Sequence, residues 1–179
     1  MFRARIVVGI VFSLVGVALA ALVLLYFAQP TSYRFSRTRT IVAPRERVMS
    51  HLSELHAFEA WDPWASMPTD PPTVTYSPVS SGVGAWVDRR DSHGGARTTI
   101  TSITADRVEM TNTTFGGLGG NTSTQSFELR DSAGGTEVTW SLGADLHGLA
   151  RMLWPFVHLE ESAGRDMDEA LVRLDQASQ

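Results

Sequence analysis

The chain has 179 residues, no cysteine, and 15 basic residues, all arginine, against 19 acidic residues. Without cysteine or lysine it can form no disulfide, thiol nucleophile, cysteine-ligated metal site, lysine Schiff base or P-loop lysine contact. Once Arg3 and Arg5 are set aside, 13 arginines face the 19 acidic residues, and this formal charge of −6 argues against nucleic-acid binding.

The first predicted element is a membrane anchor over residues 1–30. From Ile6 to Ala28 the sequence IVVGIVFSLVGVALAALVLLYFA contains no charged residue. As a helix this run would extend roughly 34 Å, enough to cross a hydrocarbon core of about 30 Å. A cleaved signal peptide is the alternative, because a basic start precedes the run and Ala18-Leu19-Ala20 resembles a cleavage site. The length of the run favours an uncleaved, single-pass anchor.

Membrane orientation is weakly marked in the sequence. Arg3 and Arg5 precede the run, whereas Arg34, Arg37 and Arg39 follow it. Because a short N-terminal tail ahead of a first span more often stays inside, we expect the globular part outside the cytoplasm.

The globular part, residues 31–179, is predicted to begin with a strand and two short helices. Residues 32–43 are rich in β-forming side chains and end at Pro44, which suits the first turn of a helix over 44–55. A second short helix or turn follows over residues 56–61 and leads into the motif WDPWASMP.

A meander of six further strands fills the middle of the chain, because short β-forming runs alternate there with Gly-, Asp- and Ser-rich turns. Apolar residues occupy one side of several strands only, so the sheet needs a second layer. The predicted strands cover residues 73–77, 84–90, 96–104, 107–115, 121–130 and 136–144.

That layer is predicted to be a long amphipathic C-terminal helix starting near Leu149. Pro155 interrupts its apolar pattern, so either the main helix begins at this proline or the helix is kinked there. The predicted architecture is an α+β helix-grip fold, in which a seven-stranded curved antiparallel sheet surrounds the C-terminal helix.

Several motifs in this order resemble the SRPBCC superfamily: WDPW, SGVGA, TEVTW and GRDMDEALVRLDQ. That superfamily includes polyketide cyclase/dehydrase-like proteins, START lipid-transfer domains and pathogenesis-related plant allergens. The resemblance covers about residues 32–176 and implies a cavity for an apolar ligand between sheet and helix. Many relatives carry a Trp-acidic-Gly turn where this chain has Arg89-Arg90-Asp91, which implies a more polar pocket mouth.

The candidate ligand-binding residues are large apolar or flexible side chains around the implied cavity, together with one acid. Trp61 and Trp64 either wall the cavity entrance or plug the end of the core, and Asp62 between them is expected to fix the turn. The others are equally compatible with an ordinary core. The full set is Trp61, Trp64, Trp86, Met110, Phe115, Trp140, Met152, Phe156, Glu160 and Met167.

Glu160 is the one weak candidate for catalysis. Extending the apolar stripe across Phe156 and Ala163 places it on the inward face, where it would anchor a ligand, act as acid or base, or simply pair with an arginine. The histidines His51, His56, His93, His147 and His158 have no zinc-site spacing, so no metal site or cofactor is expected.

The sequence therefore favours a membrane-anchored domain that binds a hydrophobic small molecule or lipid-like ligand rather than a catalyst. The alternatives are a cyclase or dehydratase using Glu160 or a histidine as acid/base, and a protein-interaction module. Fold does not choose among them, because the superfamily contains carriers, enzymes and cochaperones. Oligomeric state has no signal in the sequence.

Overall fold

The computed structural model describes residues 2–65, 72–92, 94–116 and 120–179, with side chains from residue 13 onward. Its internal contacts divide the chain into two compact units. The first comprises residues 1–33 and 146–158, and the second comprises residues 34–145 and 159–179. A boundary between anchor and domain near residue 30 stays a prediction.

The first unit is built around a long helix, α1 (Phe2–Ala28). Helix α4 (Gly148–Leu153) and the 3₁₀ turn η1 (Trp154–Phe156) belong to the same unit. Among the residues whose side chains are described, which for α1 begin at residue 13, no helix is long and apolar enough to cross a membrane. The membrane anchor therefore stays a prediction.

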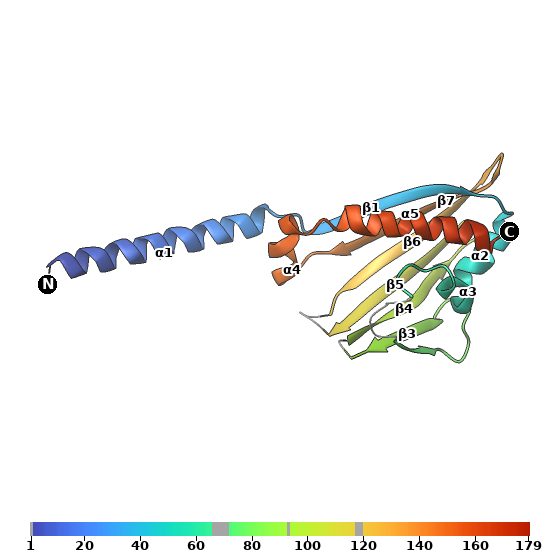
Figure 1. The fold of residues 1–179 in the computed structure, drawn as a ribbon, viewed down its shortest axis with the longest axis horizontal. Coiled ribbons are helices and arrows are strands. Elements are labelled where there is room, and N and C mark those ends of the chain that lie inside the picture. The colour runs from blue at the N-terminus through green and yellow to red at the C-terminus, as the bar shows by residue number, and fades with distance from the viewer. Residues whose placement is uncertain (1, 66–71, 93, 117–119) are drawn as a thin grey trace. The chain divides into compact units, whose positions relative to one another are not determined.

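The second unit contains the predicted seven-stranded sheet, in the order β1-β7-β6-β5-β4-β3-β2 (Figure 1). Neighbouring strands from β2 to β7 pair antiparallel, so the predicted meander is confirmed. The strands are β1 (Ser32–Ile41), β2 (Thr73–Tyr76), β3 (Trp86–Asp91), β4 (Gly94–Ile103), β5 (Arg107–Gly116), β6 (Thr122–Ser132) and β7 (Gly135–Asp145).

Helices α2 (Arg45–Ser53) and α3 (Leu55–Glu59) follow β1, as the sequence predicts. The Glu54 side chain caps α3 by accepting hydrogen bonds from the backbone N–H groups of His56 and Ala57. In Figure 1 both helices lie at one end of the sheet, and α5 (Leu159–Ala177) runs along one face of it.

Neither prediction for Pro155 is right. The proline lies inside η1, and the main helix α5 begins at Leu159 instead of at the proline or as a kinked continuation of α4. Proline removes a helical hydrogen bond and clashes with the preceding turn, so the chain breaks into two separate helices here.

The face of the sheet that carries Met110, Phe127 and Trp140 is the inner face, since all three side chains are buried. Helix α5 buries Ala163, Met167, Ala170, Leu171 and Leu174, which confirms its predicted amphipathic stripe.

Ion pairs join α5 to β1, namely Arg37 with Asp168 and Arg39 with Asp175. A Cβ at Gly164 would lie 2.1 Å from the Arg37 guanidinium, so the absence of a side chain there makes room for the arginine.

Three sequence features fall partly or wholly outside the described residues. They are part of the Gly-rich turn between the predicted strands 107–115 and 121–130 (117–119), His93, and the last three residues of WDPWASMP (66–68).

Candidate functional site

Five aromatic side chains fill the end of the inner face nearest α3. Trp61 and Trp140 are fully buried, and their ring centroids lie 5.8 Å apart in an edge-to-face arrangement. Phe58 and Phe127 pack on Trp61, and Trp64 packs on Trp140 at 5.5 Å. Such edge-to-face contacts stabilise a packed cluster beyond simple area burial. The structure therefore favours the plug over the gate for Trp61, whereas Trp64 is only half-buried.

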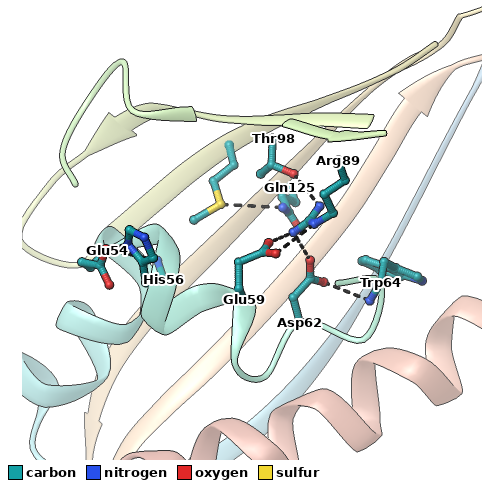
Figure 2. A network of polar contacts seen from close by, with 9 residues as sticks. Glu54, His56, Glu59, Asp62, Trp64, Arg89, Thr98 and Gln125 are labelled. Atoms are coloured by element: carbon teal, nitrogen blue, oxygen red, sulfur yellow. Dashed lines mark hydrogen bonds and ion pairs between the residues drawn. The ribbon is translucent and has the colours of Figure 1, made fainter. Parts of the chain in front are cut away.

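One arginine and two acidic side chains form a cluster close to Trp64 (Figure 2). The Arg89 guanidinium donates to Glu59 through Nε, at 3.1 Å, and through Nη2. The same Nη2 donates to Asp62 Oδ2 at 2.8 Å, and Nη1 reaches the Thr98 hydroxyl at 3.4 Å. The side chains of Arg89, Glu59 and Asp62 are only 7%, 12% and 4% exposed. One guanidinium thus serves two buried carboxyl groups.

Burial shifts the protonation equilibrium of Asp62. Glu59 takes two contacts with Arg89, whereas Asp62 takes one, so Asp62 has the weaker electrostatic support. Burial raises the pKa of Asp62 to about 7, against the opposing effects of the Trp64 backbone N–H and the Arg173 charge. Burial also lowers the pKa of Arg89 to about 10, which still leaves it cationic at neutral pH.

Asp62→Asn should flatten the dependence of folding stability on pH. The folded protein keeps the Asp62 proton at pH values where the unfolded chain, with a pKa near 4, releases it. The contribution of Asp62 to the free energy of unfolding is therefore complete below the unfolded-chain pKa near 4. It is lost as the pH rises towards the folded-state pKa of about 7. We expect the free energy of unfolding to fall by about 2–3 kcal/mol more in the wild type than in Asp62→Asn between about pH 5 and pH 8.

Urea denaturation followed by tryptophan fluorescence measures this difference. The comparison removes the contribution of other titrating groups, because these are the same in both proteins. Asparagine still accepts a hydrogen bond from Arg89, and Glu59 and Arg173, the other charged groups around the site, are unchanged. Equal pH dependence in the two proteins would contradict a raised Asp62 pKa.

Away from the aromatic plug the inner face becomes polar. Gln125, which is 4% exposed, accepts from Trp140 Nε1 at 3.2 Å and donates weakly to Met110 Sδ at 3.7 Å. The next row across the sheet pairs Thr98 with Asn112, and Asn112 with Ser123. Asn112 Oδ1 is buried and has no hydrogen-bond partner among the described residues. A buried, unsatisfied acceptor costs free energy unless another group or a water supplies a donor.

The prediction that Trp86 and Phe115 share a cavity with Trp140 is wrong. Both lie on the outer face, where the Arg97 guanidinium stacks on Trp86 at 4.3 Å and Arg90 lies 5.2 Å from the Phe115 ring. Asp88 forms ion pairs with both arginines, at 3.0 Å to Arg90 and 2.8 Å to Arg97. The reason is strand parity: Val87 and Arg89 take the inner positions of β3, so Trp86 and Asp88 face outwards.

The inward placement predicted for Glu160 is also wrong. Glu160 has the helical phase of Ala163, Gly164 and Met167, but it lies in the first turn of α5, which is not covered: Glu160 and Glu161 are both exposed. Acidic side chains at a helix N-terminus suit the helix dipole and need no buried partner. Its link to the sheet is through its backbone carbonyl, which accepts from Arg37 Nη2 at 3.5 Å.

The remaining candidates divide between the two units. Met110 and Met167 are buried in the second unit, as core residues would be. Met152 and Phe156 belong to the first unit and are 38% and 75% exposed, so neither is a buried cavity residue. Within the described residues, no group of three or more histidine, aspartate or glutamate side chains is placed to hold a metal ion.

The sequence interpretation missed Arg89 as the shared partner of Glu59 and Asp62. It did expect Asp62 to bond the local backbone, and the Trp64 N–H donates to Asp62 Oδ1 at 3.3 Å. Two acids three residues apart at a helix end, next to two tryptophans, were the available signal. The other signal was that Arg89 shares the strand phase of the apolar Val87, two residues before it.

The chain belongs to the polyketide cyclase/dehydrase and lipid transport family, whose model matches residues 32–179. This agrees with the seven-stranded sheet and C-terminal helix of the second unit. It also confirms the fold that the SRPBCC resemblance implies. The family description names cyclases, dehydrases and lipid transport and so leaves the reaction or ligand of this chain open.

Solved structures show the same fold at low sequence identity. The Mll3558 protein from Rhizobium loti has a TM-score of 0.59 at 17% identity, covering 82% of this chain and 96% of that one. A protein from Rhizobium leguminosarum gives 0.57 at 14% identity, covering 82% and 94%. The Aha1 dimer from Colwellia psychrerythraea gives 0.54 at 16% identity, covering 81% and 95%. No curated protein matched the chain.

Proposed function

We propose that the second unit binds a small, mainly apolar molecule that carries one polar group, on the inner face of the sheet next to Asn112. The unsatisfied Asn112 Oδ1 carries this proposal: the atom is covered in the free protein, and a ligand hydroxyl or amide N–H that displaced the covering side chains would supply the missing donor. Thr98 and Ser123, its neighbours across the strands, provide further polar contacts. The family description, which includes lipid transport, supports an apolar ligand.

The aromatic plug limits where such a ligand fits. Trp61, Trp140 and Phe127 are buried against one another, so the end of the inner face near α3 is already filled by side chains. Gln125 marks the transition, since it holds the Trp140 indole on one side and neighbours the polar row on the other. The apolar part of the ligand would therefore lie against Met110 and the edge of the plug.

Asn112→Leu should weaken ligand binding by about 5- to 150-fold, because it removes a buried hydrogen bond worth roughly 1–3 kcal/mol. The control is Thr111→Leu, one residue earlier on β5 and on the outer face. A dansyl-labelled fatty acid is titrated into the full chain in detergent. Energy transfer from tryptophan to dansyl then reports probe that is bound to the protein, and the two variants locate it. If both variants bind as wild type, the site is elsewhere; if the wild type binds nothing, the ligand proposal fails.

Catalysis finds less support in the same geometry. Glu160 is exposed, and Asp62, the carboxyl with a raised pKa, is sealed beneath Arg89 and the aromatic rings. A general acid or base must reach the proton it transfers. We therefore place binding ahead of a cyclase or dehydratase reaction and ahead of a protein-interaction role.

The proposal includes a membrane anchor formed by α1, with the second unit held outside the cytoplasm. Its support is the uncharged run from Ile6 to Ala28 and the exposed apolar side chains around the described part of the helix, from Leu14 to Phe27. The full chain should stay in the membrane pellet after alkaline carbonate extraction. Release into the supernatant would refute the anchor, and a cytoplasmic signal from a C-terminal reporter would refute the orientation.

A further inference from the structure

The segment formed by α4 and η1 carries an unusual number of exposed apolar side chains. Its sequence from His147 to Leu159, HGLARMLWPFVHL, contains no acidic residue, and Arg151 is its one full charge. Soluble surfaces seldom gather apolar side chains so closely without a partner. The exposed members are Leu149 at 47%, Met152 at 38%, Leu153 at 39%, Phe156 at 75% and Val157 at 47%.

Contacts within the first unit tie this segment to the end of α1. Arg151 donates to the Gln29 carbonyl through Nε at 3.1 Å and Nη2 at 2.7 Å, and to the Phe27 carbonyl at 3.3 Å. The guanidinium also lies 4.8 Å from the Tyr26 ring. The Leu146 N–H donates to the Thr31 carbonyl at 2.7 Å. The exposed apolar patch is therefore fixed beside the point where the uncharged run of α1 stops.

Arg151 performs a task that matters most in an apolar medium. The last carbonyl groups of a helix have no partner inside it, and water normally satisfies them. Where water is scarce, an unsatisfied carbonyl costs several kcal/mol. A cationic side chain that donates hydrogen bonds to these carbonyl groups is therefore favoured. The arginine also complements the negative end of the helix dipole.

Aromatic residues surround the same junction. Tyr33 and Trp154 stack with ring centroids 4.9 Å apart, and Tyr26 lies under Arg151. Burial raises the pKa of the Tyr33 hydroxyl, so it remains neutral. Tyrosine and tryptophan combine an apolar ring with a polar tip and concentrate where lipid meets water. The patch thus combines exposed apolar groups, aromatic rings with polar tips and an arginine bonded to carbonyl groups at the end of α1.

We propose that the face of α4 and η1 formed by Leu149, Met152, Leu153, Phe156 and Val157 docks on a lipid bilayer at the depth of the headgroups. The inference rests on the membrane anchor proposed above, since α1 would bring this face to the bilayer surface. Docking would bury apolar side chains that are exposed in the free chain, as an interfacial amphipathic helix does. It would also hold the first unit at the lipid surface where apolar ligands partition.

Single-cysteine labelling tests the proposal cleanly, because the chain has no cysteine of its own. Three full-length variants each carry the environment-sensitive dye NBD: Phe156→Cys on the proposed face, Leu19→Cys in α1, and Val79→Cys as an exposed control in the second unit. Each is reconstituted into phosphatidylcholine vesicles that contain lipids with a nitroxide quencher, placed either near the headgroup or near the end of the acyl chain.

We expect the Phe156 dye to be quenched at least about twofold more than the Val79 dye, and best by the nitroxide near the headgroup. The Leu19 dye should be quenched best by the deeper nitroxide. If Leu19 is quenched and Phe156 is not, the anchor stands and the docking face is refuted. Quenching of Phe156 without Leu19 keeps the docking face and refutes the anchor. If neither is quenched, both are wrong. A blue-shifted but unquenched Phe156 dye would indicate protein contact and would also overturn the proposal.

Discussion

Arg89→Met is expected to reduce the free energy of unfolding by about 3–5 kcal/mol, because it leaves two buried carboxyl groups without their cation. Methionine fills a similar volume, so the loss reports charge rather than packing. Glu59 loses two hydrogen bonds and Asp62 loses one, and their side chains are 12% and 4% exposed. Water cannot replace these bonds without opening the aromatic cluster. Urea denaturation of the full chain in mild detergent, followed by tryptophan fluorescence, measures the change.

A matched control separates this effect from the general loss of an arginine. Arg130→Met removes an arginine side chain that is 75% exposed and whose ion pair with Glu128 is long, at 4.0 Å. We expect a change within about 0.5 kcal/mol, as is usual for surface ion pairs. Comparable losses in the two variants would show that the buried ion pairs do not hold this end of the fold.

A triple variant tests whether the cluster as a whole is stabilising. The variant with Glu59→Gln, Asp62→Asn and Arg89→Met leaves no ionisable side chain in the cluster, so it should recover much of the stability that Arg89→Met loses. Failure to recover would mean that the hydrogen-bond geometry around Arg89 matters more than its charge.

Most of the fold could be predicted from the sequence, because its strands and turns follow simple rules. Several predicted strands have one apolar side, and turns rich in Gly, Asp and Ser separate them, so local chemistry and the needs of the core agree. The long helix is equally clear, since Ala163, Met167, Ala170 and Leu174 repeat at helical spacing. Pro155 was harder, because a proline after a helical turn permits a start, a kink or a full break.

Less of the candidate site could be predicted, because its residues come from distant positions in the chain and depart from the usual patterns. Arg89 is separated from Asp62 by 27 residues, and a charge in a strand normally indicates the outer face. Trp86 and Val87 are adjacent and both apolar, so alternation alone could not decide which points inwards. The structure places Val87 inside and stacks Trp86 on Arg97 outside. For Glu160 the helical spacing correctly gives the side of the helix that faces the sheet. The first turn of α5 is nevertheless not covered, so the side chain is exposed.

Trp61→Ala is expected to cost about 3–5 kcal/mol of unfolding free energy, because it removes the centre of the aromatic plug and leaves a cavity. Trp61 is fully buried, its ring contacts Phe58, Phe127 and Trp140, and its Nε1 donates to the His51 carbonyl at 3.4 Å. Trp64→Ala is the matched control: that ring is half-buried and contacts Trp140, so a clearly smaller loss is expected. Urea denaturation followed by far-ultraviolet circular dichroism measures both, because the fluorescence itself changes.

The same variant distinguishes a plug from a gate. If Trp61 plugs the core, Trp61→Ala creates a dry apolar cavity, which should bind benzene and gain stability from it, while affinity for the dansyl-labelled fatty acid changes little. If Trp61 gates the ligand site, fatty-acid affinity changes and the loss of stability is small, because a gating ring is not packed on all sides. A loss below about 1 kcal/mol would therefore contradict the plug and move the ligand site from Asn112 to the tryptophans.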